Sequence, residues 1–342
     1  MINTNGYSYD DILLVPQYSE ISSRKDISLE QSKAIGKYDL SIPIISANMD
    51  TITGEEMLYA MENFGGLGIL HRYMSIEDLD IIIRRWLKNA YSPFAVAVGC
   101  LKKDKERIDY LLTNFGDKNI IICVDIAHGD RKHMKDTLTH IRKRFSGTVI
   151  AGNVCTPEAT ERLFLWGADT VKIGVGPGSA CTTRIKTGCG FPQLTAVEEC
   201  SYIGPVIADG GIKTSGDAAK ALAAGATAVM VGGMLAGTDK TPNWRLDAEE
   251  IEFRGMASPE ARSDFEGSYK NAEGISCMVQ RKPTGSTYDV LKIIIEGIRS
   301  AMSYTGAATI KEFHAKATFI SAPPTIILEN NPHILESCSQ TQ

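Results

Sequence analysis

One loop of this chain gathers most of the residues that could carry out covalent chemistry. Residues 172–193 read KIGVGPGSACTTRIKTGCGFPQ and follow a β-branched run. The glycines of this loop let backbone N–H and C=O groups approach a ligand closely. Cys181 has hydroxyl neighbours at Thr182 and Thr183 and a cation at Arg184, and a thiol near a positive group becomes a usable nucleophile. The loop therefore predicts a nucleophilic cysteine beside a bound ligand.

The other cysteines fit other roles. Free cysteine is usually a small buried hydrophobe, which suits Cys123, Cys155 and Cys200. Cys189 lies in the same loop as Cys181 and is the alternative nucleophile. The eight cysteines are scattered along the chain without a CxxC pair. This pattern favours reduced thiols in the cytoplasm over a disulfide framework or a zinc site.

Short, mostly apolar runs alternate with amphipathic segments along the chain. Continuous apolar runs are typical of parallel strands buried on both faces, and we expect strands at residues 41–49, 67–71, 94–99, 119–127, 147–154, 170–175, 205–211 and 228–233. The segments between them predict helices, among them residues 75–88, 105–115, 131–144, 157–166 and 215–224. Eight strand–helix units predict an α/β fold whose sheet closes into a (β/α)8 TIM barrel.

The barrel predicts where function lies, because such barrels form their active sites at the C-terminal ends of the strands. Polar side chains or glycines follow most of the expected strands, namely Asn48, Asp50, His71, Asp125, His128, Asn153, Asp209, Gly210, Gly211, Gly232 and Gly233. The two glycine pairs follow the last two strands, where barrels often bind phosphate through loop amides. Tight turns are the alternative explanation of these pairs. Asp209 could accept hydrogen bonds from ribose hydroxyls or cap a helix.

The composition describes a globular protein without a general affinity for polyanions. Of 342 residues, 43% are hydrophobic and 23% are charged, and the net charge is −5. These values argue against nucleic-acid and membrane-surface partners. The chain also contains no apolar run that could span a bilayer and does not start like a secretion signal.

A barrel of this kind needs about 250 residues, so we expect one catalytic domain over residues 1–342 with its core at about 41–310. An N-terminal extension precedes this core. The segment 234–273 is rich in glycine, serine, arginine and charge, which predicts a partly mobile loop over the barrel mouth. A helix at 286–304 follows, and the tail at 323–342 is expected to be irregular.

The loop around Cys181 resembles the active-site loop of the IMP dehydrogenase and GMP reductase family. The resemblance extends over nearly the whole chain, from YDDILLVP at residues 9–16 to TFI at residues 318–320. It matches Cys181 and not Cys189, and it implies a covalent bond between Cys181 and C2 of a purine base. It also implies that Thr183 pairs with Glu273, the carboxylate of the YKNAEG segment at 269–274, to manage protons at the leaving group.

The resemblance further assigns residues to each ligand. A purine nucleotide, GMP or IMP, is expected at Asn48, Ser179, Asp209, Gly210, Gly211, Gly232, Gly233, Gly255, Met256, Ala257 and Gly274. The cofactor, NADPH, is expected at Ser23, Arg24, Arg72, Asp125, Ile126, Ala127, Gly174, Gly176, Tyr269, Lys270, Ser300 and Tyr304. The carbonyl groups of Gly176, Gly178 and Cys181 could hold K⁺. His128 could be a base or have a structural role.

The segment at residues 22–24 resembles a reductase segment that reaches the cofactor of a neighbouring subunit. This implies a homotetramer in which the cofactor site is shared between subunits. An ordinary polar loop is the alternative reading of these residues.

Three features favour the reductase branch of the family. Residues 75–93 run into the third strand without an inserted CBS regulatory domain, and no Arg-Tyr pair for water activation lies between Met256 and Glu273. Residues 269–274 and 298–307 also resemble reductase segments. Arg254 and Ala257 depart from the reductase pattern close to the base-binding loop.

The implied reaction is the NADPH-dependent reductive deamination of GMP to IMP, with release of ammonia, as part of purine salvage. One alternative is an IMP dehydrogenase without its regulatory domain, which would oxidise IMP to XMP with NAD⁺. The other is a barrel that binds a nucleotide or FMN without redox chemistry.

Overall fold

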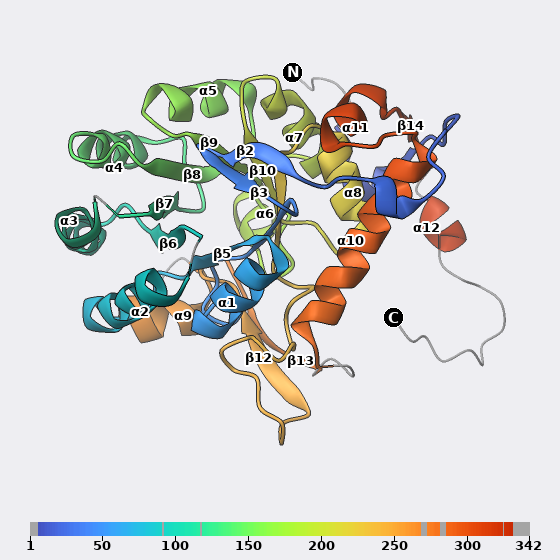
Figure 1. Ribbon diagram of the computed structural model, residues 1–342. Helices are drawn as coiled ribbons and strands as arrows, with labels where there is room; N and C mark the ends of the chain where they lie inside the picture. Colours follow the sequence, from blue (N-terminus) through green and yellow to red (C-terminus); the bar gives the residue numbers. More distant parts are fainter. Residues whose placement is uncertain are drawn as a thin grey trace.

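A closed barrel of eight parallel strands forms the centre of the computed structural model, which describes residues 6–90, 92–116, 118–267, 272–280, 285–323 and 325–330 (Figure 1). The strands follow one another around the barrel as β4 (Ile44–Ser46), β5 (Leu67–Leu70), β6 (Phe94–Val98), β7 (Ile120–Asp125), β8 (Thr148–Val154), β9 (Thr170–Ile173), β10 (Val206–Asp209) and β11 (Ala228–Val231), and β11 pairs with β4. The prediction of a (β/α)8 barrel is therefore confirmed. The first strand begins later than expected, because Pro43 has no N–H to donate to a neighbouring strand, and it also ends earlier, at Ser46.

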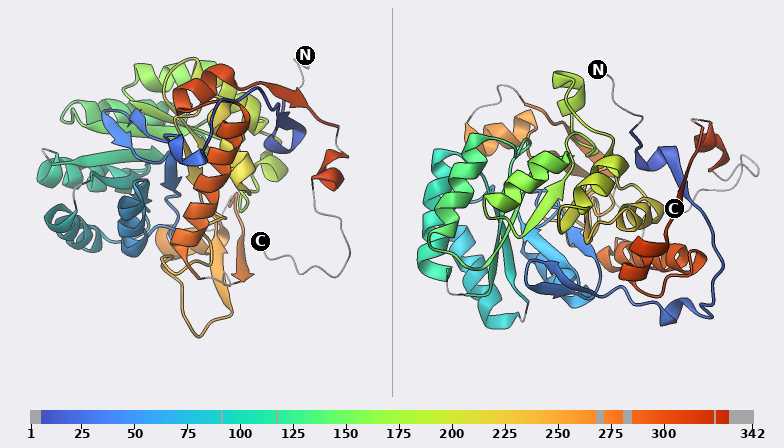
Figure 2. Two further views of the ribbon diagram at one scale, coloured as in Figure 1. Left: turned by 45° about the vertical axis from the view of Figure 1, so that its right-hand side comes forward. Right: turned by 90° about the horizontal axis from the view of Figure 1, so that it is seen from above.

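Helices cover the outside of the barrel (Figures 1 and 2). They are α1 (Glu55–Phe64), α2 (Ile76–Asn89), α3 (Lys102–Phe115), α4 (Lys132–Arg142), α5 (Pro157–Leu165), α7 (Gln193–Ser201), α8 (Ser215–Ala223), α10 (Thr287–Tyr304) and α11 (Ile310–Lys316). The short helix α6 (Thr183–Thr187) instead belongs to the loop after β9, at the barrel mouth. Several begin at a hydroxyl that caps a free backbone N–H, as Ser75 does for Asp78 and Thr214 for Asp217. These local signals explain why the helix positions could be read from the sequence.

The barrel interior is closed at the N-terminal ends of its strands by the hairpin of β2 (Gln31–Ile35) and β3 (Tyr38–Leu40). Ala34, Ile35 and Leu40 of this hairpin pack into one buried cluster with inward-facing residues of the barrel strands. Gly36 donates its backbone N–H to the Thr170 hydroxyl at the start of β9. Since the hairpin fills this end, the opposite end, where the strands terminate, is left to form a site.

A strand near the start of the described residues pairs with a strand near their end, at the side of the barrel. After the short 3-10 helix η1 (Tyr9–Asp11), β1 (Ile12–Leu14) pairs antiparallel with β14 (Phe319–Ser321). A second 3-10 helix, η2 (Arg24–Asp26), contacts α10. A short helix, α12 (Ile326–Glu329), lies in the part of the tail predicted to be irregular. Residues 331–342 of that tail lie outside the described residues.

The segment after β11 is more ordered than the sequence indicated. The predicted loop at 234–273 contains β12 (Glu250–Arg254) and α9 (Pro259–Glu266), and β12 pairs antiparallel with β13 (Ser276–Gln280). This hairpin extends away from the barrel at the bottom of Figure 1. The prediction missed it because β12 alternates charged and apolar residues, β13 is largely exposed and a helix separates them, so neither shows the apolar run of a barrel strand.

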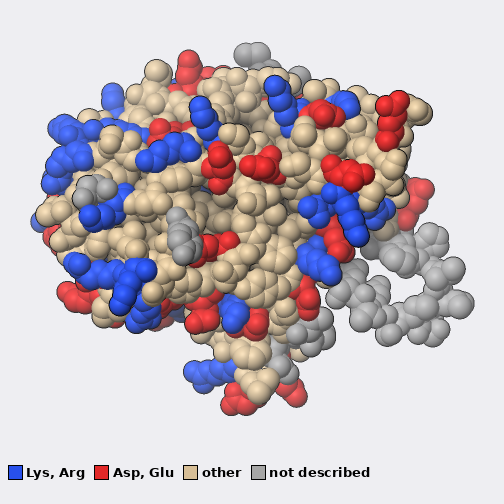
Figure 3. Space-filling view, viewed as in Figure 1, with Lys and Arg blue, Asp and Glu red and all other residues tan. Residues whose placement is uncertain are grey.

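Charges of both signs are interspersed on the face shown in Figure 3. No helix within the described ranges is long and apolar enough to cross a bilayer.

Candidate active site

Cys181, Thr183 and Glu273 form a hydrogen-bonded chain at the C-terminal end of the barrel. The Cys181 thiol lies 3.2 Å from the Thr183 hydroxyl oxygen, and that hydroxyl lies 2.8 Å from Oε2 of Glu273. If the thiol donates to Thr183 and Thr183 donates to the carboxylate, a proton can pass from sulfur to Glu273 through one hydroxyl. The predicted nucleophile therefore has a carboxylate within reach through one hydroxyl, as an activated thiol requires.

The backbone holds Glu273 in place although it lies 90 positions after Thr183. Thr182 donates its N–H to the carbonyl of Glu273 at 2.9 Å, and Cys181 and Gly274 form an isolated antiparallel bridge. Glu273 donates its own N–H to Ala257 at 3.0 Å. The carboxylate is thus fixed by main-chain hydrogen bonds to both the Cys181 loop and the segment after β12.

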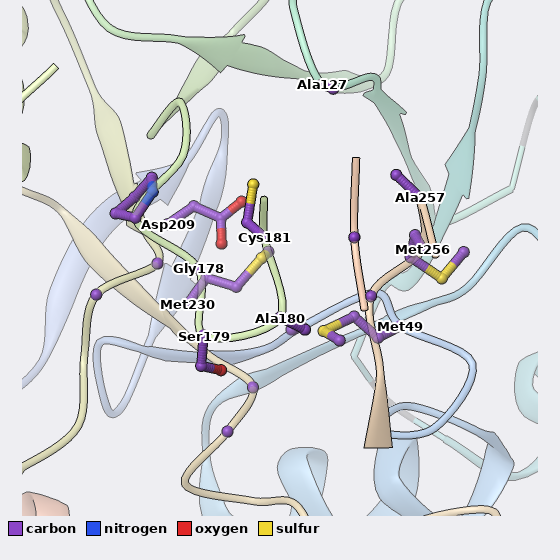
Figure 4. Close-up of a pocket in the computed structure, with 18 of the residues that line it drawn as sticks. Met49, Ala127, Gly178, Ser179, Ala180, Cys181, Asp209, Met230, Met256 and Ala257 are labelled. Atoms are coloured by element: carbon purple, nitrogen blue, oxygen red, sulfur yellow. The ribbon is translucent and has the colours of Figure 1, made fainter. Parts of the chain in front are cut away.

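Cys181 faces a cavity of about 280 Å³ at the barrel mouth (Figure 4). In Figure 4, Asp209 lies on one side of Cys181 and Met49 and Met256 lie on the other. All of the residues predicted to bind the nucleotide line this cavity, namely Asn48, Ser179, Asp209, Gly210, Gly211, Gly232, Gly233, Gly255, Met256, Ala257 and Gly274. Their individual contacts with a nucleotide stay predictions.

Glycines allow the loops around this cavity to pack closely. Gly174 has φ +153, and a Cβ there would lie 2.0 Å from the carbonyl oxygen of Asp209. Gly210 has φ +95, and its Cβ would meet Gly178 and Pro177 at 3.0 Å or less. Any other residue would push these loops apart, so the walls built by the ends of β9 and β10 require glycine.

A second, larger cavity of about 720 Å³ shares a wall with the first. Cys181, Thr183 and Glu273 line both cavities. The second cavity also contains the predicted cofactor residues Arg72, Asp125, Ile126, Ala127, Gly174 and Gly176. Ligands in the two cavities would therefore meet at the predicted nucleophile, Cys181.

Other predicted cofactor residues lie away from both cavities. Ser23 precedes η2 and Arg24 begins it, whereas Ser300 and Tyr304 belong to the C-terminal half of α10. Because η2 contacts α10, these four residues belong to one region on the outside of the barrel. Their predicted role requires a neighbouring subunit. Tyr269 and Lys270 lie outside the described residues.

The structure also places the residues of the predicted cation site and the predicted base, His128. The carbonyl of Gly178 accepts the N–H of Cys181 at 3.0 Å, which occupies one of its two lone pairs. No cluster of His, Cys, Asp or Glu suited to a metal occurs among the described residues, and the predicted K⁺ site would be built from backbone carbonyls instead. His128 lines the second cavity. Both predictions stay open.

Sequence reasoning missed Lys172 as a site residue. Its side chain is 2% exposed and forms the floor beneath Asp125 and Asp209, with Nζ 2.7 Å and 3.1 Å from their carboxylates. Burial lowers the pKa of Lys172, but the two carboxylates raise it more, so the net pKa is higher than that of a free lysine. The only sequence signal was one lysine inside the apolar run TVKI of β9.

Arg254, which departs from the sequence pattern of the reductases, has contacts that give it a structural role. Arg254 Nη2 lies 2.7 Å from Asp50, whose side chain is 7% exposed, and Nη1 lies 2.8 Å from Asp264 of α9. Burial lowers the pKa of Arg254, but the hydrogen bond and the charge of Asp50 raise it more. The net pKa is therefore higher than that of a free arginine. Arg254 therefore ties β12 and α9 to the loop after β4, next to Met256.

Known proteins resemble this chain over almost its full length. A family model described as the IMP dehydrogenase / GMP reductase domain matches residues 6–333. GMP reductases of Vibrio vulnificus (strain YJ016) and Escherichia coli O81 (strain ED1a) are 35% and 37% identical, with 91% of this chain and 93% of each relative covered. An inosine-5′-monophosphate dehydrogenase of Cryptosporidium parvum is 35% identical, with 97% and 96% covered.

A solved structure agrees with these sequence matches. The crystal structure of a cysteine-to-alanine variant of GMP reductase from Trypanosoma brucei, in complex with guanosine 5′-monophosphate, has a TM-score of 0.85 and 28% identity, covering 97% of this chain and 98% of that one. With a cysteine, threonine and glutamate aligned at the mouth of the barrel, the chain is an oxidoreductase that belongs to the IMP dehydrogenase/GMP reductase family.

Proposed function

We propose that this enzyme catalyses the reductive deamination of GMP to IMP with NADPH and releases ammonia. The observation that carries the proposal is the Cys181–Thr183–Glu273 chain in the wall shared by two cavities. Such a wall lets one ligand present a carbon to the thiol while a second ligand approaches the same carbon from the other cavity. Holding both reactants in one place removes much of the entropic barrier between them.

The smaller cavity suits a purine nucleotide. Ser179 and the glycine pairs at 210–211 and 232–233 come from the ends of three neighbouring strands, where barrels bind phosphate. A Cβ at Gly233 would lie 3.1 Å from the Ser179 hydroxyl, so this hydroxyl faces the glycine turn. The methionines Met49 and Met256 offer apolar, polarisable surface for a flat base. The neighbour from T. brucei, solved with GMP, supports this assignment.

The larger cavity suits a dinucleotide that carries phosphates. Asp125 offers a carboxylate to ribose hydroxyls, and Arg72, Arg131 and Arg262 line the same space with cationic side chains. Arg72 also lies 5.0 Å from the ring centroid of Tyr73, an aromatic surface at the edge of this cavity. These donors and charges fit NADPH, and the shared wall would bring its nicotinamide next to the base.

The proton path gives Thr183 and Glu273 their roles. As the Cys181 sulfur bonds to C2 of guanine, its proton moves to Thr183, and the Thr183 proton moves to Glu273. The same relay run in reverse protonates the amino group on C2, which leaves as ammonia and leaves a thioimidate. When bound, the reduced nicotinamide supplies a hydride to C2. Cys181 then departs as a thiolate, and IMP is free.

The short connection between Met256 and Glu273 favours this reaction over the oxidation of IMP. Hydrolysis of the covalent intermediate by a dehydrogenase needs a water-activating base, whereas reduction does not. Ala257 and Glu273 are joined by a backbone hydrogen bond, and between them the structure has α9, whose Phe265 stacks on Tyr73 at 4.8 Å. The sequence of this connection contains no Arg-Tyr pair.

The assembly and ion requirement extend the same proposal. Ser23, Arg24, Ser300 and Tyr304 lie outside both cavities of one subunit, so a homotetramer would be needed for them to contact a shared cofactor. K⁺ would be held by the carbonyls of the Cys181 loop. Light scattering and activity with and without K⁺ test these two points.

Mixing the purified protein with GMP and NADPH tests the reaction. We expect loss of NADPH absorbance matched by formation of IMP and ammonia, and no turnover by Cys181→Ala although it still binds GMP. NADH formation from IMP and NAD⁺, with no reaction of GMP, would assign the dehydrogenase instead. A yellow protein inactive in both assays would favour the FMN-binding alternative.

A further inference from the structure

Lys172 lines the smaller cavity, and its partners Asp125 and Asp209 line both cavities. It belongs to β9, and its side chain points into the barrel beneath the loops that carry the site. Gly152 on β8 pairs with Lys172, and a Cβ at Gly152 would lie 2.6 Å from the Cβ of Lys172. Glycine therefore leaves the room that a lysine needs in a barrel interior otherwise filled by apolar side chains.

Three oxygen atoms surround the ammonium group of Lys172, one for each of its N–H donors. Nζ lies 2.7 Å from Oδ1 of Asp125, 3.1 Å from Oδ2 of Asp209 and 3.2 Å from Oδ1 of Asn48. An ammonium group carries three N–H donors, so each donor has one acceptor. Asn48 in turn donates to Oδ2 of Asp125 at 2.8 Å, and Asn153 donates to Oδ2 of Asp209 at 2.8 Å. The carboxylates are therefore held in one orientation.

Each of these carboxylates also faces both ligand cavities. Asp125 and Asp209 are 20% and 21% exposed, whereas Lys172 is 2% exposed. Both aspartates line the smaller and the larger cavity. Within the described residues, Oδ1 of Asp209 accepts no hydrogen bond from the protein, so it is left to a ligand. The buried ammonium group of Lys172 thus pairs with two carboxylates, one available as an acceptor for each ligand.

We propose that Lys172 is a positioning residue that holds Asp125 and Asp209 together as ionised acceptors for the ribose hydroxyls of the two ligands. This inference rests on the proposed function. One lysine would then set the affinity for the nucleotide and for the cofactor at the same time. Loss of its charge would leave two carboxylates close together in a low-dielectric interior without a counterion. Such a pair takes up a proton and loses an acceptor.

Other charged groups contribute less to this balance. Burial raises the pKa of Asp125, and Lys172 and Asn48, with a smaller effect of Arg72, lower it to a net value below that of a free aspartate. Besides Lys172, the titratable groups that interact with one or both aspartates include Arg72, Cys100, Cys123 and Tyr9. Burial raises the pKa of Cys123 to about 12, so this thiol stays neutral and Lys172 is the dominant cation.

The test compares Lys172→Met with wild-type protein by equilibrium binding of GMP alone and of NADPH alone, at pH 8 and pH 6. We expect both dissociation constants to rise by roughly tenfold or more, as for loss of a hydrogen bond to a charged group. The ratio of variant to wild-type constants should increase as the pH falls, because the unpaired carboxylates protonate. This ratio cancels the titration of the ligands' own phosphates.

Controls separate this role from simple destabilisation. Lys292→Met removes an exposed lysine of α10 that is 68% exposed and should change neither constant. Lys172→Arg should restore much of the binding, because it keeps the charge. If Lys172→Met does not fold, Lys172→Gln carries the same test, since its amide keeps a donor but not the charge.

The outcomes discriminate between the two proposals. Affinities for GMP and NADPH that stay within threefold of wild type, or a ratio that does not change with pH, would overturn the role of Lys172 while wild-type turnover leaves the reaction standing. A wild-type protein that neither binds nor converts GMP and NADPH would overturn both.

Discussion

Replacing Thr183 by valine removes one hydroxyl from the proposed proton relay and almost nothing else. Valine has the shape of threonine, and the side chain at this position is buried, with 8% exposure. The variant would lose both the contact of 3.2 Å to the Cys181 sulfur and the contact of 2.8 Å to Glu273. The thiol and the carboxylate would then face each other across a methyl group.

The expected effect on catalysis is much larger than the effect on stability. A net hydrogen bond contributes about 1 kcal/mol to folding, and Glu273 is half-buried, so water can replace the lost donor. Positioned acid–base catalysis contributes roughly 10²- to 10⁴-fold to rate. We therefore expect kcat to fall by about 10²-fold or more, with little change in KM and a modest change in Tm.

The assay follows NADPH oxidation and ammonia release under saturating GMP and NADPH. Thr183→Ser keeps the hydroxyl and should retain most of the activity. Thr182→Val is the matched control, because the neighbouring hydroxyl is buried and has no hydrogen-bond partner among the residues that the structure describes. A Thr183→Val enzyme with kcat within threefold of wild type would refute the relay.

Two further perturbations test the framework around the site. Arg254→Met leaves Asp50 as a buried charge without its main partner, so we expect a loss of about 3–5 kcal/mol in the free energy of unfolding, measured by urea denaturation. Adding Asp50→Asn should recover most of this loss. A single variant as stable as wild type would contradict the pairing. Burial, with the charges of Arg107 and Arg254, lowers the pKa of His71 to about 4. Unfolding therefore takes up a proton between about pH 6.5 and pH 4, and this contribution to stability is lost as the pH falls, up to about 3 kcal/mol. A His71→Asn variant should lose less stability from pH 7 to pH 4 than wild type does, and equal losses would exclude His71 as the source.

The barrel could be predicted because its strands and helices are encoded locally. Apolar runs such as FAVAV in β6 are buried on both faces, and hydroxyl residues such as Ser75 mark where helices begin. The β12–β13 hairpin could not be predicted in the same way. Its stability depends on pairing between strands that are separated by a helix, and on the ion pair of Arg254 with Asp50 in the loop after β4.

For the site, the sequence by itself identified the loop with Cys181, the glycine turns and, through resemblance, Glu273. Only the tertiary structure brings Glu273 to 2.8 Å from Thr183, since the contact depends on backbone pairing between the Cys181 loop and the segment after β12. Only the tertiary structure also assigns a role to Lys172. In sequence it is one polar residue in an apolar strand, but closure of the barrel places its charge beneath two carboxylates from other strands. A buried charge is tolerated only when it is paired. Here distant parts of the chain supply the partners, so the local sequence around Lys172 cannot predict them.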